Sequence, residues 1–285
     1  MSDDVSDIAA YYNTDPEREH QRLDRHQLEY ELTWRYLDEY LPSQGSILEV
    51  GAATGKYTLQ LAKRGHAVTA VDMSAALVEE CRKNIIEAGL KKQVRFLLAD
   101  ARNLGEVRDR EFDAVLLMGP LYHLIEESDR KKALKEAYDH VRGEGLIFST
   151  FISRFGIMGD LLKDLPNWIE QQAEVRSLLE SGKRPDGSPR GGFRGYFAQI
   201  SEIIPLHETI GFETLKLAGV EPAISADDES YNKLQGKQRQ LWLNLLYELS
   251  TQESILGASR HILYIGKKKV NSLLSQADNS TRLNQ

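Results

Sequence analysis

The chain has 285 residues, of which 41% are hydrophobic and 28% are charged. This length and apolar content suffice for one large α/β domain with a hydrophobic core. The formal net charge is −7. A nucleic-acid backbone is therefore a poor default partner, because a polyanion would meet net repulsion.

Cysteine usage and the N-terminus indicate a cytoplasmic protein. Cys81 is the only cysteine, which excludes an intrachain disulfide. The acidic start, Met1-Ser2-Asp3-Asp4, lacks the apolar core of a signal peptide. No run approaches 18 consecutive apolar residues, so we expect no membrane span.

The first predicted element is one long helix from Thr14 to Leu41. Its apolar residues recur at helical spacing on one face; they are Leu23, Tyr30, Trp34, Leu37 and Leu41. Thr14 or Asp15 would cap this helix, and Pro42 would end it. We expect residues 1–45 to form a helical lid.

Strands and helices alternate after this segment. Strands are predicted at Ser46–Val50, Ala67–Val71, Val94–Leu98, Phe112–Met118 and Leu146–Phe151. Helices are predicted between them at Thr54–Arg64, Ser74–Ala88 and Ser128–Val141. This order and the apolar strands predict a parallel sheet with helices on both faces.

The alternation is interrupted by an insertion at about 153–198. It holds a helical stretch at Leu161–Leu179 and a basic, Gly- and Pro-rich loop at 181–195, read as a surface loop or a lid over an anionic substrate. The predictions after it are a helix at Gln199–Ile210, a strand at Glu213–Leu217, a polar helical region at 228–256 and a strand at His261–Ile265. The main domain would span 46–268, and the polar tail at 269–285 is expected to be disordered.

A glycine-rich turn follows the first predicted strand. Gly51 and Gly55 let the backbone approach a ligand closely, and Asp72 ends the second strand, where a carboxylate can accept hydrogen bonds from ribose hydroxyls. A dinucleotide fingerprint would require glycine at Ala53 and a small residue at Lys56. The observed Glu-x-Gly-x-x-x-Gly spacing therefore disfavours NAD.

The segment Ile47–Tyr57 instead resembles the class I S-adenosylmethionine-dependent methyltransferases. Further matching motifs follow successive strands, and the resemblance covers about residues 12–268; they are Ala99-Asp100-Ala101, Phe112-Asp113-Ala114-Val115, Met118-Gly119-Pro120-Leu121-Tyr122-His123-Leu124, Gly143-Glu144-Gly145-Leu146 and Gly211-Phe212-Glu213. The resemblance implies a Rossmann-like, seven-stranded, mostly parallel sheet with helices on both faces and an antiparallel edge hairpin.

The same resemblance implies a site for S-adenosyl-L-methionine, with S-adenosyl-L-homocysteine as product. Glu49 would lie near the methionine ammonium, Asp100 near the adenine amine, and Arg22 or Arg25 near the methionine carboxylate. An alternative for either arginine is a solvated helix face. The expected cofactor-binding residues are Tyr12, Arg25, Glu49, Gly51, Ala52, Ala53, Gly55, Tyr57, Asp72, Met73, Asp100, Ala101 and Met118.

His123 is the candidate general base, because it follows the carboxyl end of the fourth strand, where parallel sheets bind ligands. A structural role is the alternative for this histidine. The histidines show no metal-ligand spacing, and no metal is expected.

The sequence thus predicts methyl transfer to a small-molecule acceptor by in-line displacement, in a monomer or homodimer with no nucleic-acid or membrane partner. The alternatives are a nucleic-acid or protein methyltransferase and a non-catalytic cofactor-binding scaffold. The Asn/Asp-Pro-Pro-Tyr/Phe motif of amino-methylating enzymes is replaced here by Gly119-Pro120-Leu121-Tyr122. The sequence does not identify the acceptor.

Overall fold

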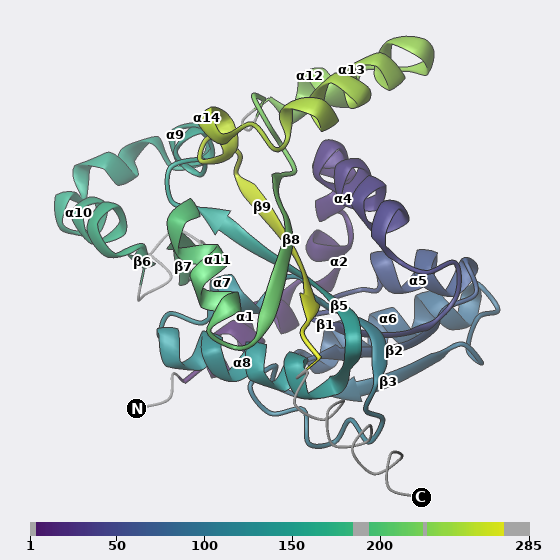
Figure 1. Cartoon of the computed structure of the whole chain (residues 1–285). Helices are drawn as coiled ribbons and strands as arrows, with labels where there is room; N and C mark the ends of the chain where they lie inside the picture. The colour runs from purple at the N-terminus through teal and green to yellow at the C-terminus, as the bar shows by residue number, and fades with distance from the viewer. Residues whose placement is uncertain (1–3, 185–193, 225–226, 271–285) are drawn as a thin grey trace, which may run out of the picture.

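The structure is a computed structural model that describes residues 4–184, 194–224 and 227–270. Its described residues form a nine-stranded sheet in the order β3-β2-β1-β4-β5-β7-β6, with β9 paired to β5 and β8 (Figure 1). The strands are β1 (Ser46–Val50), β2 (Ala67–Asp72), β3 (Val94–Leu98), β4 (Phe112–Leu117), β5 (Val141–Ser153), β6 (Lys183–Arg184), β7 (Gly195–Ala198), β8 (Phe212–Gly219) and β9 (His261–Lys268).

Strands β1 to β5 pair in parallel, whereas β9 is antiparallel to both β5 and β8. The predicted parallel sheet with an antiparallel edge hairpin is confirmed. The two strands beyond the expected seven, β6 and β7, belong to the insertion.

Helices cover both faces of the sheet. On one face α7 and α8 pack against β5, with α8 also on β4, and α11 packs against β8 and β9. On the other face α5 and α6 pack against β2, with α6 also on β3, and α4 and α13 pack against each other in the same hydrophobic cluster. The helices are α1 (Ser6–Thr14), α2 (Pro16–His20), α3 (Arg22–Arg25), α4 (Gln27–Tyr40), α5 (Lys56–Lys63), α6 (Ala75–Glu87), α7 (Pro120–His123), α8 (Glu127–His140), α9 (Met158–Asp164), the 3-10 helix η1 (Pro166–Glu170), α10 (Gln172–Ser181), α11 (Ile200–Glu208), α12 (Asp228–Asn232), α13 (Gly236–Leu249) and α14 (Glu253–Leu256).

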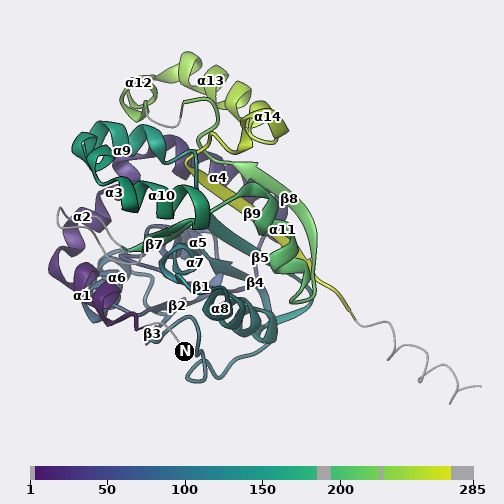
Figure 2. The same ribbon diagram turned by 90° about the vertical axis from the view of Figure 1, so that its left-hand side faces the viewer.

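The prediction of one helix from Thr14 to Leu41 is wrong. The chain forms four helices from Ser6 to Tyr40, with non-helical backbone at Asp15 (φ −149°, ψ 74°) and His26 (φ −112°, ψ 62°). Asp15 caps α2 by accepting a hydrogen bond from the N–H of Arg18 at 3.0 Å. These breaks let α1 and α2 turn back and lie beside α6 (Figure 2).

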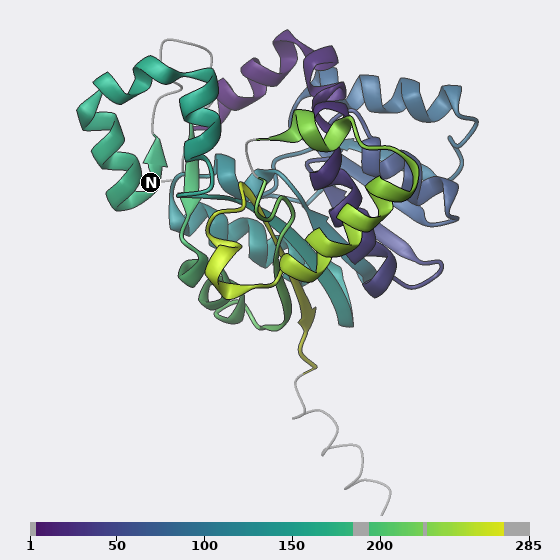
Figure 3. The same ribbon diagram turned by 90° about the horizontal axis from the view of Figure 1, so that it is seen from above.

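The insertion forms α9, η1 and α10, which lie away from α5 and α6, whereas α12 and α13 lie beside α4 (Figure 3). Most of the predicted basic loop, 185–193, and most of the predicted tail, 271–285, lie outside the described residues. No helix in the part of the chain that the structure describes is long and apolar enough to cross a membrane.

Candidate functional site

The glycine turn joins β1 to α5 at the carboxyl edge of the sheet. The N–H groups of Gly51 and Ala52 donate to the carbonyl of Val71 at 2.8 and 3.0 Å. Gly51 has φ +82°, and a Cβ there would lie 2.7 Å from Cδ of Pro120. Only glycine fits this position without strain, because the turn is pressed against the start of α7.

Asp72, at the end of β2, fastens the turn from the neighbouring strand. One carboxylate oxygen accepts the N–H of Ala53 and the other accepts the N–H of Ser74, both at 2.9 Å. Burial raises the pKa of Asp72, and the backbone donors oppose that shift. Each carboxylate oxygen can accept a further hydrogen bond, so the side chain remains able to bind a ligand.

A cavity opens above this turn, between the carboxyl edge of the sheet and the N-terminal helices. Its wall includes residues from β1, β2 and β5, from the segments that follow β1, β2, β3 and β4, and from α1 to α4. The residues that line it include Tyr12, Glu19, Arg22, Glu29, Glu49, Gly51, Ala52, Ala53, Tyr57, Asp72, Met73, Asp100, Ala101, Met118, Tyr122 and His123.

The N-terminal helices cover the cavity and are held there by side-chain contacts. These contacts join Asn13 to Ser74 (2.7 Å), His20 to Thr54 (3.0 Å) and Lys56 to Asp24 (2.9 Å). The partners on the sheet side lie in or beside the glycine turn and at the start of α6. The lid therefore contacts the same backbone that forms the cavity floor.

Glu49 is a buried carboxylate in the cavity wall. It accepts a hydrogen bond from the hydroxyl of Thr58 at 2.6 Å. Burial raises the pKa of Glu49 to about 8, although the Thr58 hydroxyl lowers it. A cationic ligand beside this side chain would favour its ionised form.

Asp100 follows β3 and is oriented by Arg102. The Arg102 guanidinium donates to Asp100 through Nε at 3.0 Å and Nη2 at 2.6 Å, and through Nη1 to Asp129 at 2.9 Å. The backbone N–H of Arg102 also donates to Asp100 at 2.8 Å. This arrangement fixes the Asp100 carboxylate at the cavity wall.

His123 lies in α7 and contacts the lid. Its Nε2 is 2.9 Å from the hydroxyl of Tyr12, and the two rings meet edge to face with centroids 5.4 Å apart. Burial lowers the pKa of His123 to about 3, so the imidazole is neutral at physiological pH.

The structure brings together most of the cofactor-binding residues predicted from the sequence. Eleven of these thirteen line the cavity, and Arg25 and Gly55 do not. Arg25 is exposed and donates to the carbonyl of Arg18 at 3.0 Å. Gly55, with φ +84°, caps α5, and a Cβ there would lie 2.6 Å from Sγ of Cys81. The arginine in the cavity is Arg22.

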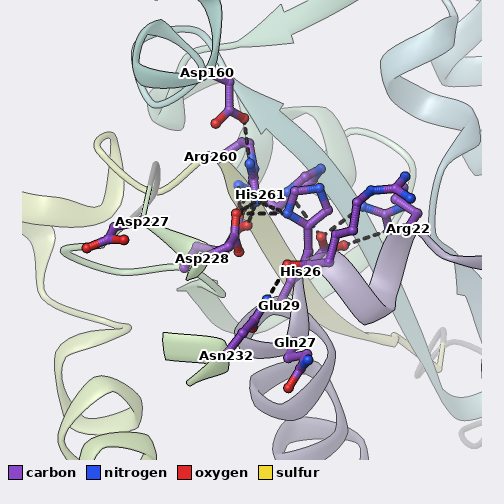
Figure 4. A network of polar contacts seen from close by, with 12 residues as sticks. Arg22, His26, Gln27, Glu29, Asp160, Asp227, Asp228, Asn232, Arg260 and His261 are labelled. Carbon is purple, nitrogen blue, oxygen red and sulfur yellow. Dashed lines mark hydrogen bonds and ion pairs between the residues drawn. The ribbon is translucent and has the colours of Figure 1, made fainter. Parts of the chain in front are cut away.

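A buried ionic network behind the cavity was not anticipated (Figure 4). Arg22 donates to both oxygens of Glu29 at 2.8 Å, and Glu29 is 3.5 Å from Nδ1 of His261. His261 Nδ1 is 2.9 Å from Glu221, which also binds Arg260. The network thus leads from the cavity wall to the start of β9.

Arg260 then connects this network to two further segments. It binds Asp160 of α9 at 2.6 Å and Asp228 of α12 at 3.2 Å. His26, Glu221 and Asp228 lie close enough together to hold a metal ion. Arg260 already supplies a cation there, because its Nη2 contacts both carboxylates and lies 2.8 Å from His26 Nδ1.

Comparison with known proteins agrees with this geometry. Residues 47–145 match a family model described as a methyltransferase domain. The chain is 28% identical over 120 residues to a ubiquinone biosynthesis O-methyltransferase of Pseudomonas entomophila (42% of this chain, 50% of the relative). It is 22% identical over 138 residues to a tRNA 5-carboxymethoxyuridine methyltransferase of Escherichia coli K12 (46% and 51%). The chain therefore spans about half the length of the curated relatives that it matches.

A solved structure resembles nearly the whole chain. Magnesium protoporphyrin IX methyltransferase from Synechocystis PCC 6803, with bound S-adenosylhomocysteine, has a TM-score of 0.58 at 14% identity. The match covers 94% of this chain and 100% of that one. Because only 14% of the aligned residues are identical, this likeness shows that the two chains share a fold and nothing about their substrates.

Proposed function

Because residues 47–145 form a class I S-adenosylmethionine-dependent methyltransferase domain, we propose that this chain transfers a methyl group from S-adenosylmethionine to a small-molecule acceptor. The observation that carries the proposal is one cavity lined by Glu49, Asp72 and Asp100 beside the glycine turn. These carboxylates lie at or just beyond the carboxyl ends of three adjacent parallel strands, where such sheets bind ligands.

The residues present fit this cofactor. Asp72 keeps unused acceptor capacity for ribose hydroxyls, and Asp100 is held at the cavity wall by Arg102. Glu49 is buried and suits an ammonium group, since a cation would offset the cost of its ionisation. Of the two arginines predicted for the methionine carboxylate, Arg22 lines the cavity and would bind it, whereas Arg25 does not line the cavity.

When bound, S-adenosylmethionine supplies an electrophilic methyl group on a sulfonium centre. The chain's own contribution is orientation and exclusion of water. Tyr12 and His123 join the lid to α7 and form a partly buried wall. The acceptor must lie opposite the sulfur, because in-line displacement requires that alignment.

His123 remains a prediction as general base. Its neutral imidazole has the protonation state that a base needs, but its Nε2 already contacts the hydroxyl of Tyr12. This contact supports a second role, in which His123 positions Tyr12 against the acceptor.

A small-molecule acceptor fits the cavity better than a nucleic acid. The cavity is covered by α1 to α4, and its carboxylates would repel a phosphate backbone. The relative acting on tRNA keeps a nucleic-acid acceptor as an alternative to be tested. A scaffold that binds the cofactor without turnover is the other alternative.

Titration calorimetry with S-adenosylhomocysteine, followed by a turnover assay that detects this product, tests the proposal. We expect binding and turnover on a small acceptor. Turnover on bulk tRNA alone would favour the nucleic-acid alternative. Binding without turnover on a broad acceptor panel would favour the scaffold.

A further inference from the structure

Glu19 is a cavity-lining carboxylate whose hydrogen-bonding capacity is unused. It lies on α2, and its side chain is 21% exposed. The one ion-pair partner of its carboxylate among the described residues is Arg22, with Nε 3.5 Å from Oε1, and no hydrogen bond from a described residue to that carboxylate is present. Partly buried carboxylates ordinarily accept several hydrogen bonds, so this one is available to a ligand.

The neighbouring charges leave Glu19 without full compensation. Arg22 forms its two short hydrogen bonds with Glu29. In the cavity wall two carboxylates, Glu19 and Glu29, share the guanidinium of Arg22. Behind the wall three more carboxylates share the guanidinium of Arg260; they are Asp160, Glu221 and Asp228. His261 adds no charge, because burial lowers its pKa to about 3. This end of the cavity therefore favours a cation.

Aromatic rings provide a second feature that favours a cation. Tyr12, Tyr122 and His123 line the cavity, with centroids 5.4 Å apart for Tyr12 and His123 and 4.8 Å apart for Tyr122 and His123. Aromatic faces carry negative electrostatic potential and attract organic cations. An anionic acceptor would meet both these rings and the carboxylate of Glu19.

We propose that the methyl acceptor is an organic amine, bound as its ammonium beside Glu19 and methylated on nitrogen. This inference rests on the proposed function and specifies its substrate class. Glu19 would accept one proton from the ammonium, which frees the nitrogen lone pair. Burial raises the pKa of Glu19, as suits a proton acceptor.

The transfer step balances without a further reactant. The amine nitrogen forms a bond to the methyl carbon while the carbon–sulfur bond breaks, and that electron pair moves to sulfur. The products are a methylated ammonium and the neutral thioether. The proton held by Glu19 leaves to solvent when the products dissociate.

Binding to the S-adenosylhomocysteine complex tests the substrate class. The probes are 2-phenylethylamine and butylamine, each compared by calorimetry with the alcohol and the carboxylate of the same carbon skeleton. We expect each amine to bind more tightly than its two counterparts. An amine that binds no better than its counterparts overturns the inference.

Two glutamates of α2 provide a matched pair of variants. Glu19→Gln should weaken amine binding roughly ten- to hundredfold, because a charged hydrogen bond is lost. Its loss of affinity for the amine should exceed any change in its affinity for S-adenosylhomocysteine, measured on the same protein. Glu17→Gln should match the parent, since Glu17 is exposed and, among the residues that the structure describes, its carboxylate is hydrogen-bonded to Gln21 alone.

Equal amine affinity in Glu19→Gln and the parent, or an equal loss in Glu17→Gln, would overturn the role of Glu19. Failure of the parent to bind S-adenosylhomocysteine would instead contradict the proposed function. Intact S-adenosylhomocysteine binding without amine preference contradicts only the substrate class.

Discussion

Replacing Asp72 by asparagine tests the cofactor site at the residue with the most defined geometry. Its two carboxylate oxygens accept the N–H groups of Ala53 and Ser74 at 2.9 Å. Asparagine keeps one acceptor oxygen, and its amide NH₂ would face the other backbone N–H. We expect a stability loss of about 1–3 kcal/mol from the buried donor left unpaired.

The same substitution should weaken ligand binding. It removes the charge and at least one acceptor for the ribose hydroxyls, and hydrogen bonds to charged groups contribute about 1.5–3 kcal/mol. The dissociation constant for S-adenosylhomocysteine should therefore rise roughly ten- to hundredfold. Calorimetry measures this change, and urea unfolding measures the stability loss separately.

Asp113→Asn is the matched control. Asp113 also accepts a backbone N–H, from Ser46 at 2.8 Å, together with the Nε of Arg142 at 2.8 Å. It lies near the amino end of β4, away from the cavity. Asp113→Asn should be less stable than the parent but bind S-adenosylhomocysteine with the parent's affinity. Parent-like binding by Asp72→Asn would refute the assignment of the ribose site.

Three further predictions concern single residues of the cavity. Because folded Glu49 keeps a proton up to a pH of about 8 while the unfolded chain releases it near 4.5, the free energy of unfolding should fall as pH rises through this window. In Glu49→Gln the free energy of unfolding, measured with urea, should depend less steeply on pH. A pH dependence as steep as that of the parent would contradict the raised pKa of Glu49. Gly51→Ala should lower the unfolding free energy by about 1–3 kcal/mol, because φ is +82° and the new Cβ would meet Pro120; a parent-like denaturation midpoint would contradict this. If His123 positions Tyr12, the Tyr12→Phe variant should lose most of the turnover that His123→Ala loses. If His123 is instead a general base, Tyr12→Phe should keep a turnover close to that of the parent.

The alternating strands and helices were predictable because their signals are local. Apolar runs such as Ser46–Val50 and glycines such as Gly65 and Gly89 mark where elements end, and the structure keeps these boundaries within a few residues. The carboxylates Asp72 and Asp100 were predictable as neighbours for the same reason. Each follows or ends a strand, and parallel strands bring their carboxyl ends to one edge.

The lid helices were not predictable from periodicity. The apolar residues of α3 and α4 keep helical spacing across the break at His26, which no glycine or proline marks. The break depends instead on tertiary contacts, including that of His26 with Asp228 at 2.9 Å. The choice between Arg22 and Arg25 depends on the same bend, since it turns one into the cavity and leaves the other exposed.

The ionic network behind the cavity has no sequence signature. Glu221 and His261 become neighbours only because β8 and β9 pair with Gly219 opposite Ile262. Glu29 reaches them from a helix near the other end of the chain. Such contacts depend on the topology of the sheet. The charges at the lid end of the cavity, where the acceptor is proposed to bind, could therefore not be predicted before the fold was known.

Calorimetry of the folded 285-residue chain with S-adenosylhomocysteine tests the central claim most directly, with NAD⁺ as the competing cofactor class. The cavity lined by Glu49, Asp72 and Asp100 predicts one S-adenosylhomocysteine bound per chain and no binding of NAD⁺. Absence of binding to either S-adenosylmethionine or S-adenosylhomocysteine, or binding of NAD⁺ in their place, would contradict the account.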